Sequence, residues 1–391
     1  MTPRICKQLG GSLAALLAAA GLIAPARAAE PDFGPAREIL LRGLANRAYP
    51  GGTVMVGTSQ RTLWVEAFGD FDYANNTSVS CTTIYDLASL TKVAGTTAVF
   101  MRLVALGKLS VNETVGNRLP EFIDAATGPE ERSWRQKITI EHLLTHTAGF
   151  ASWKPLYKSV NSYPDLLKAI YATPLEGEPG KQVRYSDLGM ILAGELAARV
   201  GGKPLAELER ELVFIPLGMS ATLRSPAETL LARIPPTERW PDSDGFVRGV
   251  VHDENARAGQ GITGHAGLFS TAEDLGKLAT EWLRALEGHS QLFPKAVVEN
   301  FFQDRNLPAN SHRTLGWGLR RNEDGSFGPM LSHTGFTGTA IWIDPVKKFH
   351  VVLLTNRVHP TRDNNRINQV RRDFIEAVAA AMAKTSASKP E

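Results

Sequence analysis

The sequence predicts a mixed α/β fold in which one antiparallel sheet is built from both ends of the chain and carries flanking helices. Two short apolar strands are expected near the start, at residues 53–57 and 63–68, and two more near the end, at 338–343 and 350–354. The intervening stretch, residues 107–264, is rich in helical segments and loops. This order of strands, helices and strands indicates a helical insertion between the two halves of one sheet.

The expected helices follow from apolar periodicity and from stop signals. Residues 87–106 form the first, with small residues that allow close packing on a sheet. Within the insertion, helices are expected at 138–144, 188–200 and 206–214, the second ending at a glycine pair and the third at a proline. An amphipathic helix over 367–383 completes the chain.

The predicted domain boundaries follow these changes in pattern. Residues 1–28 are expected to be a signal peptide, 29–106 and 265–384 a discontinuous α/β sheet domain, and 107–264 a mainly helical subdomain. The polar residues 385–391 are expected to form a disordered tail. A chain of 391 residues is long enough for such an arrangement to bury a large core.

The N-terminal segment has the order of a secretory signal. Two basic residues, Arg4 and Lys7, precede an apolar run, and Ala26-Arg27-Ala28 follows as a small-residue cleavage pattern. The run is too short to span a bilayer, and no later segment is apolar for about eighteen residues. We therefore expect a periplasmic or secreted protein with no membrane span after cleavage, in which Cys81 remains as a single packing thiol.

The charge distribution argues against nucleic acid as a partner. The formal net charge is +3, and acidic and basic residues are interspersed without a basic stripe. Apolar residues make up 43% of the chain and charged residues 21%, which is typical of a globular protein.

The first candidate motif is Ser89-Leu90-Thr91-Lys92. Residues three apart on a helix share a face, so the lysine amine is expected within reach of the serine hydroxyl. A neutral lysine can accept the serine proton, and burial lowers the pKa of a lysine toward neutrality. The alternative is a helix cap beside a surface lysine. A second copy of the spacing, Ser386 to Lys389, lies in the polar tail without apolar surroundings and is interpreted as accidental.

Two further motifs lie far along the chain. Tyr185-Ser186-Asp187 precedes the expected helix at 188–200, so a loop tyrosine could relay a proton; the alternative is a packed tyrosine beside a helix N-cap. His333-Thr334-Gly335 precedes the expected strand at 338–343, where a donor, a hydroxyl and a glycine would let a substrate lie against a strand edge. The alternative there is a polar turn.

The three motifs in this order resemble those of the serine β-lactamase and penicillin-binding-protein superfamily, nearest its class C and esterase-like branch. The segments Leu143–Phe150 and Pro216–Met219 also look like that branch. The resemblance covers residues 36–380 and implies a β-lactamase/transpeptidase-like fold. Two more segments, Val251–Ala256 and Gly264–Thr271, look like the subgroup that contains proteins named as periplasmic D-Ala-D-Ala carboxypeptidases and exo-acting muramyl-L-alanine amidases.

The resemblance implies a role for each matched residue. Ser89 would be acylated, Lys92 would accept its proton, and Tyr185 would pass protons to the leaving group and to the deacylating water. His333 would supply the donor of the third motif, and the backbone N–H groups of Ser89 and Phe336 would form the oxyanion hole. The residues assigned to substrate binding or to the oxyanion hole are Asp187, His333, Thr334, Gly335 and Phe336.

Two residues depart from the pattern of the superfamily. Asp187 stands where the lactamases have asparagine, and a carboxylate beside Lys92 would favour its charged form. Either Asp187 is held away from the lysine or Tyr185 carries more of the base role. His333 stands where the lactamases have lysine, and histidine is a weaker anchor for a substrate carboxylate at neutral pH.

The sequence therefore predicts an exported serine hydrolase without cofactor or metal that acts on a small molecule. A cell-wall peptide or muropeptide amide ranks first, a small ester second and a β-lactam third. A non-catalytic penicillin-binding sensor and a zinc hydrolase using His252 and His265 are the alternatives from other classes. Arg357 could bind a substrate carboxylate, although a surface cation is the simpler interpretation.

Overall fold

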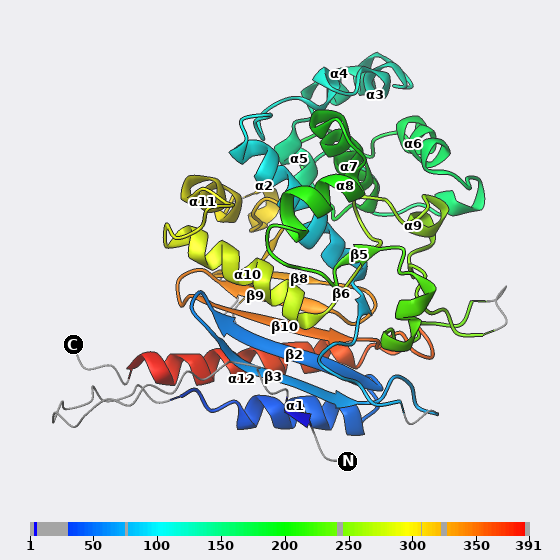
Figure 1. Cartoon of the computed structure of the whole chain (residues 1–391). Coiled ribbons are helices and arrows are strands. Elements are labelled where there is room, and N and C mark those ends of the chain that lie inside the picture. The colour runs from blue at the N-terminus through cyan, green and yellow to red at the C-terminus, as the bar shows by residue number, and fades with distance from the viewer. Residues whose placement is uncertain are drawn as a thin grey trace.

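A seven-stranded antiparallel sheet forms the base of the molecule (Figure 1), with strand order β1-β3-β2-β10-β9-β8-β7. The structure is a computed structural model that describes residues 4–5, 30–74, 77–240, 245–305, 307–321 and 327–387. The strands of this sheet are β1 (Arg4–Ile5), β2 (Gly51–Thr58), β3 (Thr62–Gly69), β7 (Gly318–Arg321), β8 (Phe327–Thr334), β9 (Ala340–Asp344) and β10 (Phe349–Thr355).

The centre of the sheet joins the two ends of the chain, because β2 pairs with β10. Apolar residues alternate between the two faces along β2: Val54 and Val56 lie in one core, whereas Met55 lies in the other. The two central strands are thus buried on both faces, which explains their nearly continuous apolar sequence. The predicted α/β fold with one antiparallel sheet is confirmed.

Helices cover both faces of this sheet. Helices α1 (Gly34–Ala45) and α12 (Ile367–Ala387) pack together on one face, below the sheet in Figure 1. On the other face, α10 (Ala272–Leu286) packs against β2 and β10. The remaining helices lie beyond α10, on that same side of the sheet.

Most of these remaining helices come from the middle of the chain. They are α2 (Ala98–Ala105), α3 (Pro120–Asp124), α4 (Pro129–Lys137), α5 (Ile140–Leu144), α6 (Tyr163–Ala172), α7 (Asp187–Gly201), α8 (Leu205–Glu209), α9 (Glu254–Ala258) and α11 (Lys295–Phe302). Short 3-10 or π-helical turns are η1 (Ala88–Leu90), η2 (Lys92–Thr97), η3 (Val115–Asn117), η4 (Leu156–Lys158), η5 (Arg210–Phe214), η6 (Glu228–Arg233) and η7 (Pro308–Asn310). The discontinuous domain boundaries stay a prediction.

A second, three-stranded sheet connects the two regions. Its order is β4 (Tyr85–Asp86), β6 (Leu268–Ser270) and β5 (Leu223–Arg224). These strands are too short to show a period-2 pattern, so the sequence did not predict them. Through β4 and β6, the residues just before Ser89 are held against the segment that follows Gly264.

Some element boundaries differ from the predictions. The strand expected at 338–343 begins at Ala340, because the residues before it form a turn. Helix α12 extends to Ala387, with the Thr385 hydroxyl bonded back to the Ala381 carbonyl oxygen, so it continues into the expected tail. Helix α7 ends at Gly201, and its C-cap Gly202 has a φ of 71°, the glycine C-cap that was predicted.

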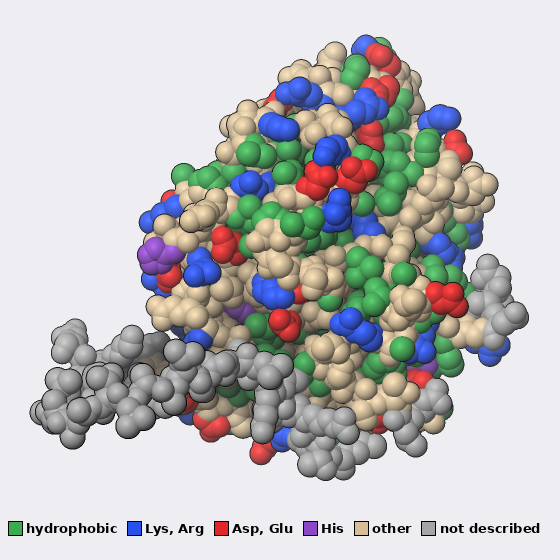
Figure 2. All heavy atoms as spheres, viewed as in Figure 1, with side chains coloured by type: hydrophobic (Ala, Val, Ile, Leu, Met, Phe, Trp, Pro, Cys, Tyr) green, Lys and Arg blue, Asp and Glu red, His purple; other side chains and the backbone are tan. Residues whose placement is uncertain are grey.

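The expected signal peptide lies almost wholly outside the described residues; only Arg4–Ile5 is described, paired with β3. Cys81 packs against the main core as expected. In the full chain Cys81 is disulfide-bonded. The single thiol expected after signal cleavage stays a prediction. Among the described residues, no helix has the length and apolarity needed to cross a membrane. Figure 2 shows basic and acidic side chains interspersed over the visible face.

Candidate active site

Ser89 and Lys92 meet at the start of the helix that runs into α2. Ser89 lies in the turn η1 and is half-buried, and Lys92 begins the π-helical turn η2 and is fully buried. The Lys92 Nζ donates to Ser89 Oγ over 2.9 Å. The residue before the serine, Ala88, has a φ of 46°, a left-handed conformation that non-glycine residues seldom adopt and that is frequent at functional sites.

The Lys92 ammonium has two more close partners. It lies 2.7 Å from Asp187 Oδ1 and donates to the His265 carbonyl oxygen over 3.1 Å, and the Tyr185 ring centroid is 4.9 Å away. Burial lowers the pKa of Lys92, but attraction to Asp187 and to Tyr185 outweighs burial, so that its pKa is raised above the ordinary value. Asp187 is therefore not held away from the lysine, and Lys92 is charged in the resting site.

Tyr185 stands over Lys92 between two histidines. Its ring centroid lies 4.5 Å from that of His146 and 6.1 Å from that of His333, and 38% of the residue is exposed. Ser186 is the N-cap of α7, accepting from the Gly189 N–H over 3.1 Å. The alternative of a helix N-cap in this motif is thus confirmed for Ser186. The cap fixes the start of α7 and with it the position of Tyr185, the preceding residue.

The third motif, His333-Thr334-Gly335, lies at the end of strand β8. Hydrogen bonds hold the turn that follows it against the residues before Ser89. Two hydroxyls from the following turn, those of Thr337 and Thr339, donate to the carbonyl oxygens of Asp86 over 2.7 Å and of Leu87 over 2.9 Å. A Cβ at Gly335 would collide with the Thr339 hydroxyl and with the Leu87 carbonyl, so only glycine fits there.

These tethers bring the predicted substrate-binding edge close to Ser89. Thr334 and Phe336 are exposed there. The Phe336 N–H finds no acceptor among the described residues, as expected of an oxyanion-hole donor.

His333 does not replace the charge of a lysine. The residue is 6% exposed, and burial, together with the charges of Lys92 and Arg313, holds its pKa well below the ordinary value. Its Nδ1 lies 3.1 Å from the Thr334 carbonyl oxygen, which can only accept, so Nδ1 carries the proton. The neutral ring then offers Nε2 as an acceptor, whereas the sequence predicted a donor.

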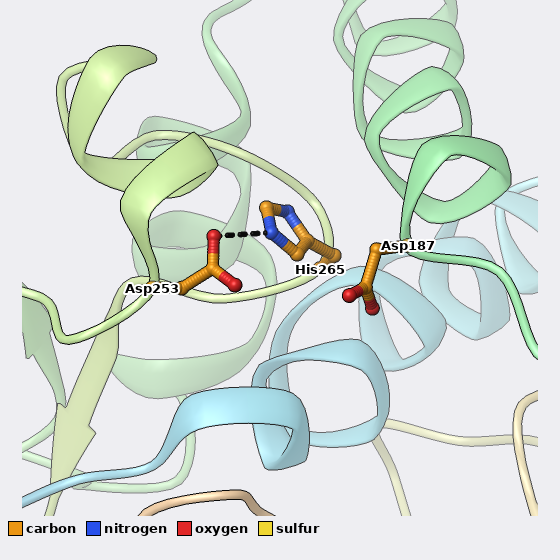
Figure 3. Close-up of side chains that lie close together, drawn as sticks. All are labelled: Asp187, Asp253 and His265. Atoms are coloured by element: carbon orange, nitrogen blue, oxygen red, sulfur yellow. Dashed lines mark hydrogen bonds and ion pairs between the residues drawn. The ribbon is translucent and has the colours of Figure 1, made fainter. Parts of the chain in front are cut away.

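The two subgroup segments support Lys92 and its helix. The Gly264 carbonyl oxygen accepts from the Thr96 hydroxyl over 2.7 Å, and the Leu268 N–H donates to the Thr91 hydroxyl over 3.1 Å. Further along, the His265 side chain bonds Asp253 over 2.8 Å, the contact drawn in Figure 3. This hydrogen bond thereby orients the residue whose carbonyl oxygen accepts from Lys92.

The proposed zinc pair does not come together in a shared site. His252 Nε2 pairs with Glu238 over 2.8 Å, whereas His265 pairs with Asp253. Within the described part of the chain, the group close enough for a metal is Asp187, Asp253 and His265, and it does not include His252. In Figure 3 no interaction joins Asp187 to the other two, and its ion pair is with Lys92.

Arg313, which lies near the site, had no sequence signal. His142 and His146, four residues apart, were interpreted as structural rather than as a metal pair, whereas the His146 ring packs against Tyr185. The interpretation of Arg357 as a surface cation is wrong. The residue is 5% exposed and donates to the carbonyl oxygens of Phe336 and Arg362 over 2.8 and 2.7 Å.

Comparisons with known proteins agree with this geometry. The family model described as Beta-lactamase matches residues 36–375. A protein of Salmonella agona (strain SL483) named "Putative D-alanyl-D-alanine carboxypeptidase" is 32% identical over 316 residues, which are 73% of this chain and 72% of the relative. A protein of the same name from Salmonella typhi matches to the same extent.

Solved structures share the fold at lower identity. EstCE1, described as a hydrolase with promiscuous acyltransferase activity, superposes with a TM-score of 0.72 at 21% identity, covering 88% of this chain and 97% of that one. A class C β-lactamase from Rhodobacter sphaeroides superposes with a TM-score of 0.67 at 20% identity, covering 88% of this chain and 99% of that one. The matched family model spans nearly the whole described sheet and all three motifs, and so the chain belongs to the Beta-lactamase family of serine hydrolases.

Proposed function

We propose that the protein is an exported hydrolase that forms an acyl-enzyme on Ser89 and cleaves amide bonds of cell-wall peptides or muropeptides. The observation that carries the proposal is the buried Lys92 amine 2.9 Å from the Ser89 hydroxyl. A nucleophilic serine needs such a group to fix its hydroxyl and balance its developing charge. The D-alanyl-D-alanine carboxypeptidase name of a 32% identical relative supports a cell-wall peptide as substrate.

The geometry supports separate roles for Lys92 and Tyr185 in the acylation of Ser89. Lys92 is held as an ammonium by Asp187, so it acts first as a donor to Ser89 Oγ. An ammonium cannot accept a proton, which leaves the Tyr185 hydroxyl, next to Lys92, as a relay that takes the serine proton while it passes its own proton to the leaving amine. The bond from Ser89 Oγ to the acyl carbon forms, the amide C–N bond breaks, and the proton passes to the leaving amine. Water then attacks the ester and restores Ser89.

The test is mass spectrometry of purified muropeptides before and after incubation with the protein, using Ser89→Ala as control. Loss of a terminal amino acid or release of the peptide from muramic acid supports the proposal and states which bond is cut. Unchanged muropeptides combined with rapid hydrolysis of p-nitrophenyl acetate would show a small-ester esterase instead. Labelling of Ser89 by a fluorescent penicillin without any turnover would show a sensor.

A further inference from the structure

Asp86 is a buried carboxylate that takes no part in the proposed reaction. It lies three residues before Ser89, at the end of strand β4, and is 4% exposed. Burial raises the pKa of its carboxyl, whereas hydrogen bonds from backbone N–H groups lower it. Placing a charged group in the interior costs free energy, so Asp86 is expected to contribute something that an apolar side chain at this position could not.

Each oxygen of the Asp86 carboxylate accepts from a different segment of the chain. Oδ1 accepts from the Ala88 N–H over 2.8 Å, and Oδ2 accepts from the His252 N–H over 2.7 Å. An asparagine at this position would have one acceptor oxygen, so it could satisfy one of these two donors and not both. The two bonds together therefore require a carboxylate.

The first bond holds a residue in a strained conformation. Ala88 has a φ of 46°, which costs an alanine free energy that it does not cost a glycine. The residue before it is fixed, because the Leu87 N–H donates to the Leu268 carbonyl oxygen over 2.9 Å. Ala88 is therefore the point at which the chain turns from the fixed strand toward Ser89, and the Asp86 carboxylate opposes relaxation of that turn.

The second bond connects this turn to the other side of the site. His252 is itself anchored, since its Nε2 lies 2.8 Å from the Glu238 carboxylate and its ring stacks on the Phe336 ring with the centroids 5.6 Å apart. Phe336 carries one of the two N–H groups predicted for the oxyanion hole, and Ser89 carries the other. Asp86 thereby links the segments that present both predicted donors.

We propose that Asp86 is a positioning residue for the nucleophile. Its carboxylate holds Ala88 in the left-handed conformation, which directs the Ser89 hydroxyl toward Lys92 and the Ser89 N–H toward the oxygen of the acyl group. Asp86 contacts neither the substrate nor the reacting atoms and acts through the backbone alone. This inference rests on the acyl-enzyme proposed for Ser89, but not on the identity of the substrate.

The test measures the rate at which a fluorophosphonate probe labels Ser89. Asp86→Asn should lower this rate about 10- to 100-fold, as a small misplacement of a reacting group does. Adding Ala88→Gly to that variant should restore the rate about fivefold or more, because glycine adopts a positive φ without help from the carboxylate. A residue that only supports the core would not be rescued by a change at position 88.

Asp344→Asn is the matched control. Asp344 is likewise 4% exposed, and its Oδ1 accepts from the N–H groups of Val346 and Lys347 over 3.0 and 2.8 Å in the turn between β9 and β10. This variant also neutralises a buried carboxylate that binds backbone groups, but away from the nucleophile, so its labelling rate should equal that of the wild type. Urea unfolding shows which variants are folded under the labelling conditions.

If Asp86→Asn does not fold, the double variant is compared with Ala88→Gly alone. Loss of the carboxylate should then change the labelling rate less than about threefold, because glycine at position 88 needs no carboxylate to keep a positive φ. Unfolding of Asp86→Asn in both backgrounds would make Asp86 a residue that stabilises the core and would overturn the inference.

Labelling of Asp86→Asn at the wild-type rate also overturns the inference, as does a loss of rate that Ala88→Gly does not reduce or that Asp344→Asn shares. If labelling depends on Asp86 in a protein that leaves muropeptides unchanged, the proposed substrate is rejected and the positioning role is kept. Cleavage of muropeptides through Ser89, with labelling that is independent of Asp86, would do the reverse.

Discussion

The Lys92 ammonium lies 2.7 Å from the Asp187 carboxylate while it donates to the Ser89 hydroxyl 2.9 Å away. The carboxylate and the nucleophile therefore share one buried amine. An asparagine at position 187 would accept a hydrogen bond without stabilising the charge, so the aspartate makes the resting lysine cationic. The pH dependence of acylation should reflect this difference.

Asp187→Asn should move the acid limb of kcat/KM to lower pH by about one unit or more, the usual effect of removing an adjacent opposite charge. Asp187 is the strongest of the groups that raise the pKa of Lys92, so without it the pKa falls, although Tyr185 still raises it against burial. The neutral amine is then available as a proton acceptor at lower pH. The measurement is the rate of p-nitrophenyl acetate hydrolysis from pH 5 to 10. Asp124→Asn, which removes an exposed carboxylate, is the control. If Asp187→Asn gave the same pH profile as the wild type, Lys92 would not titrate during acylation.

Tyr185→Phe should lower kcat by about 10²- to 10⁴-fold with a smaller change in KM, the range for loss of a general acid–base group. The ring would keep its contacts with His146 and His333, so only the hydroxyl is lost. Steady-state kinetics and the rate of fluorophosphonate labelling of Ser89 measure the effect. Tyr73→Phe, whose hydroxyl bonds the Arg47 carbonyl oxygen, serves as control. If Tyr185→Phe kept the kcat of the wild type, Tyr185 would not take the serine proton and Lys92 would have to do so.

Gly335→Ala should destabilise the protein by about 1–3 kcal/mol, as overpacking typically does, and slow the labelling of Ser89. The new methyl group would collide with the Leu87 carbonyl and the Thr339 hydroxyl, which tie β8 to the nucleophile segment. Urea unfolding and labelling kinetics test both parts. Gly177→Ala, whose methyl group would meet no atom within 4 Å, provides the comparison. If Ser89 were labelled in Gly335→Ala as fast as in the wild type, the close packing of Gly335 on Leu87 would not be what positions Ser89.

Glu131→Gln should destabilise the protein at pH 7 by about 3 kcal/mol, because it leaves the fully buried Arg135 without a charge partner. Burial raises the pKa of Glu131, but hydrogen bonds from Thr127, Leu175 and Arg135 outweigh it and lower the pKa to about 2.

The lowered pKa of Glu131 determines in which direction its contribution to stability changes with pH. The carboxylate contributes stability above its ordinary pKa of 4.5, and this contribution is lost as the pH falls through about 2. Urea midpoints at pH 7 and pH 3 should therefore converge for wild type and variant. The exposed pair of Glu113 and Arg118 gives the control variant Glu113→Gln. A difference that stays constant down to pH 2 would contradict the charge explanation.

The sequence predicted those features that depend on near neighbours. Ser89 and Lys92 are three residues apart, so even a turn that is part 3-10 and part π brings their side chains together. Strands β2 and β10 were predictable because burial on both faces requires nearly continuous apolar residues. The short strands β4, β5 and β6 were not, since two or three residues show no period.

The order of the three motifs also came from the sequence, through the resemblance, and the structure brings Tyr185 beside Lys92 and His333 beside Tyr185. Their protonation did not follow from the motifs. His333 is neutral because tertiary packing buries it beside two cations, and burial is a property of the folded chain.

By itself, the sequence determined the pairing of Ser89 with Lys92 and the sheet that supports them, because helical spacing and apolar runs act over a few residues. Only the tertiary structure decided that Asp187 pairs with Lys92, that the His265 carbonyl oxygen accepts from the same amine, and that the His146 ring packs against Tyr185. Charges act through space, and the segments that bring these groups together are far apart along the chain.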